Sequence, residues 1–156
     1  MNKAIAKIIA IVTMAFICTT ANAQSNPFDK YADSRDVTYI YISKTMLGLM
    51  GSKISANIND VNISEIINGL NSIQIITSGT AATKKSLKNE AQSIVKKNKY
   101  ELLMQVSEND RKVDIYHKES KDNSVIVMIT DNENETVLIV FSGTFSTENV
   151  MKMIQQ

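Results

Sequence analysis

The tripeptide Ser-Gly-Thr occurs twice in the chain, at residues 78–80 and 142–144, each time after a β-branched run and before a helix-like stretch. Backbone N–H groups at the start of a helix can hold a phosphate or a carboxylate. The residues that could bind an anion weakly in this way are Ser78, Gly79, Thr80, Ser142, Gly143 and Thr144. Few other patterns in the sequence offer any chemistry, so these joints are the first candidates for a site.

Both tripeptides lack the residues that a phosphate loop or a serine nucleophile requires. A phosphate loop needs a second glycine directly before a Lys-Ser/Thr pair, and the stretch GTAATKKS does not have it. A nucleophile elbow has the pattern G-x-S-x-G, which surrounds neither Ser78 nor Ser142. The pattern therefore favours two strand-to-helix joints, in which glycine permits a tight turn and a hydroxyl group caps the next helix.

The remaining candidates for chemistry are a single histidine and two acidic turns, at residues 108–111 and 131–135. A catalytic histidine needs a nucleophile and an acidic partner, and no such set surrounds His117, which lies in phase with Val113 and Ile115 on a predicted strand. The acidic run DNENE at residues 131–135 lacks the glycine and the distant glutamate of a calcium loop. We therefore expect a half-buried structural histidine and a solvated hairpin tip, with no catalytic residue, metal site or cofactor.

The first residues of the chain have the pattern of a secretory signal peptide. Lys3 and Lys7 precede a short apolar run at residues 8–18, and Ala21-Asn22-Ala23 is a small-x-small cleavage signal. A retained anchor helix is less favoured because a spanning helix needs about 20 apolar residues. A lipid anchor on Cys18 is disfavoured, because large residues precede it where lipoprotein signals usually carry small ones. The sequence thus predicts cleavage after residue 23 and export to the periplasm or envelope.

Removal of residues 1–23 changes the composition of the chain. The only cysteine, Cys18, would be lost, so thiolate chemistry and disulfides are excluded for the mature protein. The 17 basic residues less Lys3 and Lys7 leave 15 against 16 acidic ones. A near-neutral chain gives no electrostatic reason to bind nucleic acid. After the signal, no segment predicts a transmembrane helix, and the remaining length suits one domain.

A polar leader and two β-α units are predicted in the first part of the mature chain. Residues 24–36 contain the only proline and read as a flexible leader, which Phe28 and Tyr31 could pin. β-branched and aromatic runs indicate strands, and apolar residues at helical spacing indicate helices. On these patterns the predicted strands are 37–43 and 72–77, and the predicted helices are 44–51, 63–70 and 82–97.

The second part of the chain reads as four strands joined by short polar turns. The predicted strands are 100–106, 112–118, 124–130 and 136–144, followed by a helix from about residue 146. They form an antiparallel meander, which one or two N-terminal strands extend, with helices packed mainly on one face. Residues 37–156 are thus expected to form a single α+β domain, a two-layer sandwich.

Three segments of the chain resemble an exported family of unknown function. They are FDKYADSRDVTYIYISKTML, YELLMQVSENDRKVDIYHKE and VLIVFSGTFSTENV. They are similar, in the same order, to the exported Bacteroidetes proteins of domain-of-unknown-function family 4252. The resemblance implies one compact envelope domain with no established activity and no catalytic residues to transfer. Genes for such proteins often neighbour genes for extracytoplasmic sigma factors, and the resemblance therefore implies a role in envelope stress or signalling.

The last two predicted strands are apolar on both faces, so one of their faces is left to be covered. Ile126, Met128, Leu138 and Val140 are the candidates for this second face. An uncovered apolar patch marks a binding site for a partner. We expect a non-catalytic exported protein that binds an envelope protein or itself. The alternative is a carrier of a small apolar, lipid-like ligand, motivated by the Met- and Ile-rich interior, and an uncharacterised enzyme is third.

Overall fold

The computed structural model describes residues 26–51, 57–58, 61–62 and 68–145. The predicted signal peptide, most of the predicted helix 63–70 and the predicted C-terminal helix lie outside these residues. The main elements are η1 (Asp29–Asp33), β1 (Val37–Ser43), α2 (Lys44–Gly51), β4 (Leu70–Ser78), α4 (Ala81–Lys97), β5 (Glu101–Glu108), β6 (Arg111–Ser120), β7 (Asn123–Asp131) and β8 (Thr136–Gly143). A small separate pair is formed by β2 (Asn57–Ile58) and β3 (Val61–Asn62).

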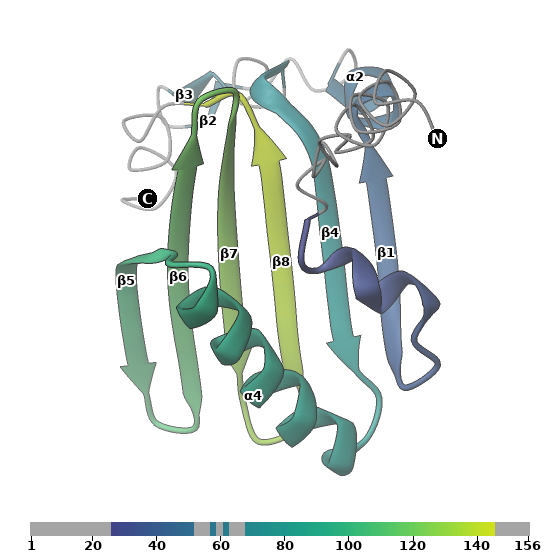
Figure 1. The fold of residues 1–156 in the computed structure, drawn as a ribbon, viewed down its shortest axis with the longest axis vertical. Helices are drawn as coiled ribbons and strands as arrows, with labels where there is room; N and C mark the ends of the chain where they lie inside the picture. The colour runs from purple at the N-terminus through teal and green to yellow at the C-terminus, as the bar shows by residue number, and fades with distance from the viewer. Residues whose placement is uncertain (1–25, 52–56, 59–60, 63–67, 146–156) are drawn as a thin grey trace, which may run out of the picture.

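The main sheet has six strands in the order β1-β4-β8-β7-β6-β5, and every neighbouring pair is antiparallel. Figure 1 shows the strands side by side in an open sheet, with α4 lying obliquely across its front. Two α-helices, α2 and α4, accompany this sheet in the described part of the chain. This arrangement agrees with the α+β class expected from the sequence.

Helix α4 begins at a capping box. The Oγ1 of Thr80 accepts a hydrogen bond from the N–H of Thr83, and the Thr83 hydroxyl oxygen accepts one from the N–H of Thr80. These bonds satisfy backbone donors that a helix start otherwise leaves unpaired. Leu87, Ala91 and Val95 recur at helical spacing and are buried against the sheet.

We call the side of the sheet that α4 covers the helix face. Its core is made by side chains from residues 26–33, which we call the N-terminal segment, from α4 and from the three strands β4, β7 and β8. The buried members are Phe28, Tyr31, Ile76, Leu87, Ala91, Val95, Val127, Ile129, Leu138 and Val140. The described part of the predicted leader therefore contributes two aromatic side chains to the core.

A polar network fixes the N-terminal segment to the helix face. The Nε2 of Gln74 donates to Asp29 Oδ1 at 2.6 Å and to the Tyr39 hydroxyl at 3.2 Å. Its Oε1 accepts a hydrogen bond of 3.1 Å from Asn26 Nδ2. Gln74 is almost fully buried, so these bonds replace the water that its amide group loses. This network sets the position of the segment on the sheet in a way that apolar contacts alone would not.

Candidate interaction surface

The sheet has a second side, opposite α4, which we call the second face. Directly opposite residues of an antiparallel pair point to the same side of a sheet, so the strand register assigns its side chains. The middle row across the six strands is Ile40, Ile75, Ile139, Met128, Ile115 and Met104. The row nearer α2 is Ile42, Ile73, Phe141, Ile126, His117 and Glu101, and the third row is Thr38, Thr77, Val137, Thr130, Val113 and Val106.

These three rows carry almost no charge. The middle row is entirely aliphatic or thioether, and threonines are the most polar residues of the third row. Glu101 is the one acidic residue in the rows and stands on the edge strand β5. A buried core has this composition, whereas the solvent-facing side of an ordinary antiparallel sheet carries mainly polar residues.

The second face is partly exposed in the described structure. At its two edges Ile40 is 47% exposed, Met104 38% and Val106 39%. Between these edges most of its side chains are half-buried. Ile115 and Ile126 are buried under neighbours that include Leu103, Phe141 and Phe145. That cluster contains, among the described residues, strand side chains and Phe145 but no residue of α2 or α4.

The structure divides the four residues predicted for this face between the two sides of the sheet. Ile126 and Met128 lie on the second face, but Leu138 and Val140 are fully buried on the helix face. The register explains the correction, because Ile126 pairs with Phe141 and Met128 pairs with Ile139. The β8 residues that share the second face are therefore Ile139 and Phe141.

His117 is a buried polar residue of the second face. Only 5% of it is exposed, and its Nε2 has no hydrogen-bond partner among the residues that the structure describes. Its neighbours across the strands are Glu101 on β5 and Ile126 on β7. An unpaired buried polar atom costs free energy, so this nitrogen is a place where a bound molecule could donate or accept a hydrogen bond.

The polar atoms of the first Ser-Gly-Thr joint are used within the protein. The Ser78 Oγ accepts a buried hydrogen bond from the N–H of Thr136, and the Thr80 hydroxyl caps α4. The nearby lysines are also engaged, since Lys84 Nζ donates to the carbonyl oxygen of Glu133 and Lys88 Nζ lies 2.6 Å from Asp131 Oδ2. These contacts leave little at this helix start to attract an anion.

The second joint has a different role. A Cβ added to Gly143 would collide with the carbonyl oxygen of Gly69 and the Cα of Leu70. The N–H of Thr144 donates to Gly69 oxygen at 2.8 Å. Gly143 therefore permits two backbone segments to touch, and the helix predicted after this joint lies outside the described residues. By contrast, a Cβ at Gly79 would meet no atom within 4 Å.

Asp131 holds the end of β7 to α4. Burial opposes ionisation of its carboxyl, but hydrogen bonds from Lys88 and Thr136 and the charges of Lys88 and Lys84 outweigh it and lower the pKa of Asp131. The following turn is closed by Asn132 Oδ1, which accepts from the N–H groups of Asn134 and Glu135. In the described residues no three His, Cys, Asp or Glu side chains gather as metal ligands.

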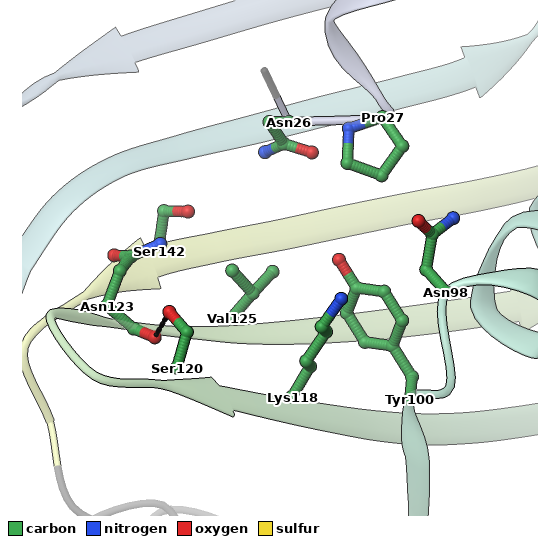
Figure 2. Close-up of a pocket in the computed structure, with 9 residues that line it drawn as sticks. All are labelled: Asn26, Pro27, Asn98, Tyr100, Lys118, Ser120, Asn123, Val125 and Ser142. Atoms are coloured by element: carbon green, nitrogen blue, oxygen red, sulfur yellow. Dashed lines mark hydrogen bonds between the residues drawn. The ribbon is translucent and has the colours of Figure 1, made fainter. Parts of the chain in front are cut away.

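A small cavity lies at the C-terminal end of α4 (Figure 2). Its volume is about 130 Å³, and polar side chains from segments far apart in the sequence surround it. The Lys118 Nζ lies 5.6 Å from the centre of the Tyr100 ring, and burial raises the pKa of Tyr100 to about 12. The lining residues are Asn26, Pro27, Asn98, Tyr100, Lys118, Ser120, Asn123, Val125 and Ser142. The cavity suits a few waters or a small polar molecule.

Comparison with known proteins gives one match. The model of a family described as "Domain of unknown function (DUF4252)" matches residues 31–153, which is most of the chain. Neither the curated proteins nor the solved structures contain a match. Among the described helices, none has the length and apolar character needed to cross a membrane.

Proposed function

The chain belongs to the family described as Domain of unknown function (DUF4252), and from that premise we propose that it is a non-catalytic interaction module that binds a protein through its second face. The observation that carries the proposal is the apolar surface formed by the three rows of side chains, which are buried at Ile115, Ile126 and His117 and half-buried or exposed elsewhere. It runs from β1 at one edge of the sheet to β5 at the other. Contiguous apolar surfaces of this size are characteristic of protein–protein contacts.

The proposed architecture is a two-layer sandwich in which β5–β8 act as a four-strand meander, β1 and β4 extend it, and the helices cover mainly the helix face. We further propose that residues 1–23 direct export and that the mature protein works in the periplasm or on the envelope. A role in envelope stress or signalling would fit such a module, because signalling there depends on protein contacts.

The proposal that the protein is non-catalytic is supported by the hydrogen bonds that already engage its candidate polar side chains. Ser78, Thr80 and Asp131 are each committed to hydrogen bonds within the fold. His117 stands among apolar side chains and beside one edge carboxylate, Glu101. A general base would need a nucleophile and an orienting acid within hydrogen-bond distance.

In-cell photo-crosslinking tests this function. A photoreactive amino acid would replace Ile139 at the centre of the second face, and in a matched chain it would replace Lys85, which is exposed on α4. We expect protein adducts from position 139 and few from position 85. Adducts from position 85 alone, or none from either position, would contradict a binding role for the second face.

The carrier of a small apolar ligand is a second candidate because of His117. Its unpaired Nε2 adjoins the apolar rows, as a hydrogen-bonding group for the polar head of a lipid-like molecule would. Native mass spectrometry of the recovered protein distinguishes this candidate. A bound mass of a few hundred daltons that is released on denaturation would favour the carrier over the protein-binding module.

A further inference from the structure

We propose that the partner of the second face is a second copy of this chain, stacked sheet on sheet. This inference rests on the proposed function and adds the identity of the bound protein. The resulting dimer would have four layers, with the α4 helices outside and the two sheets inside. Each sheet would then be covered on both faces.

The size of the second face fits a dimer. Six strands about 4.8 Å apart span roughly 29 Å, and three rows at about 6.7 Å per two residues span roughly 20 Å, giving a projected area of about 600 Å² per copy. Because Ile115, Ile126 and His117 are already buried within the chain, two copies would bury at most about 1,200 Å², which is the lower end of the range for specific protein–protein interfaces. A surface of this extent is far larger than a drug-sized ligand needs.

The chemistry of the second face is compatible with itself. In a two-fold symmetric contact the same patch meets its own copy, so a charged patch would repel its partner. The middle row has no charge, and Glu101 stands at the outer edge, on β5. Rows of isoleucine and valine can interdigitate when two sheets stack about 10 Å apart, at the crossing angle of about 30° that their twist produces.

Stacking also accounts for the double-sided apolar character of β7 and β8. In β8, Leu138 and Val140 fill the helix face while Ile139 and Phe141 lie on the second face. Strands that are apolar on both sides normally lie between two covering layers. The helix layer supplies one cover, and the copy of the sheet would supply the other.

Sedimentation velocity of the purified chain over a range of concentrations tests this inference. We expect the wild type to be a dimer at micromolar concentration. Ile139→Lys should weaken dimerisation at least tenfold, because it places two lysines at the centre of the contact. Circular dichroism verifies that this variant is folded, and Met128→Lys, also in the middle row, is the second variant.

Two edge residues of equal exposure supply a matched control. Ile40 belongs to the second face, whereas Leu102 pairs with Tyr116 and lies outside the three rows, and each is 47% exposed. Ile40→Lys should weaken the dimer, and Leu102→Lys should leave it unchanged. Dimers that resist Ile139→Lys but are lost in Leu102→Lys would overturn the proposal in favour of pairing through the β5 edge.

The failure of this inference can be separated from the failure of the proposed function. A wild type that stays monomeric at about 100 μM, together with adducts from position 139 to a different protein, would overturn only the second copy as partner. A monomer that gives no adducts would overturn both. A dimer that Ile139→Lys separates supports both.

Discussion

The two faces of the sheet differ in how their apolar side chains are accompanied by polar ones. On the helix face, Gln74, Ser78 and Asp131 surround the apolar centre with hydrogen bonds that fix the N-terminal segment, β8 and α4 in place. The second face has three nearly uncharged rows, and the one buried polar atom on it that lacks a partner is His117 Nε2 among the described residues. A face completed within the chain thus carries polar anchors, whereas the other has the composition of a core without them.

The sharpest test of this difference uses two adjacent residues. Leu138 is fully buried on the helix face and Ile139 lies on the second face. Leu138→Lys should destabilise the fold by at least ~3 kcal/mol, because it buries an unpaired charge in a close-packed core. Ile139→Lys should cost the monomer less than ~1 kcal/mol, since its charge can reach water.

Urea unfolding of both variants, followed by circular dichroism at a concentration where the wild type is monomeric, measures the two free energies of unfolding. Similar losses from both substitutions would mean that the second face is also completed within the chain. The comparison between the faces would then fail.

The next effect concerns the anchors of the helix face. Gln74→Leu keeps the approximate volume but leaves the Asp29 carboxylate, the Tyr39 hydroxyl and the Asn26 amide without their shared partner. We expect a loss of about 2 kcal/mol, within the range for unsatisfied buried polar groups. Hydrogen exchange should show faster opening of residues 26–33 than of β7. Unchanged exchange there would mean that Phe28 and Tyr31 alone hold the segment.

The pH dependence of stability tests the contact between α4 and β7. Because the folded pKa of Asp131 is lowered below its ordinary value of 3.8, the carboxylate stabilises the fold above that pH. This contribution is lost as the pH falls below about 4 and through the folded pKa. Asp131→Asn should therefore be less stable than the wild type by about 1 kcal/mol at pH 7 and equally stable near pH 2. A difference that persists unchanged in acid would assign the effect to packing.

A similarly small effect is expected at the cap of α4. Thr80→Ala removes both hydroxyl bonds of Thr80 with Thr83 and should cost about 1 kcal/mol. Thermal unfolding should show the loss, while the dimerisation constant should not change, because this residue lies on the side of the helix face. A weakened dimer would connect the two faces in a way that their geometry does not predict.

Much of the fold was predictable because local patterns carry it. The predicted strands 37–43 and 112–118 and the helix 82–97 lie within two residues of β1, β6 and α4. The cap at Thr80 was visible as a hydroxyl residue before an amphipathic stretch. These features depend on neighbouring residues, so a sequence pattern is enough to place them.

The assignment of residues to faces was only partly predictable. In β8 both alternating sets are apolar, so the period of two does not identify the side that faces α4. The register to β7 decides it. This register pairs Met128 with Ile139, and not with Leu138 or Val140, which had been predicted for the second face. For the same reason, half of the predicted second-face residues belong to the helix face.

The two Ser-Gly-Thr joints show why identical tripeptides have different roles. Gly143 is necessary because backbone from residues 69–70 lies against it, and this neighbour is far away in the sequence. Gly79 has free space around it and no such requirement. The Gln74 network and the cavity near Tyr100 are likewise built from distant segments, so no local pattern could indicate them.

Thiol accessibility in intact cells tests the central claim most directly, namely that the second face is covered by a bound protein. Cys18 is the only cysteine, so a Cys18→Ser chain accepts a single probe at Ile139→Cys or, as the exposed control on α4, at Lys85→Cys. We predict that position 139 reacts with a maleimide at least ~10-fold more slowly than position 85 in cells, and that dilution of the purified protein reduces this difference to what the half-burial of Ile139 within the chain causes. Equal reaction of both positions in cells would contradict the account.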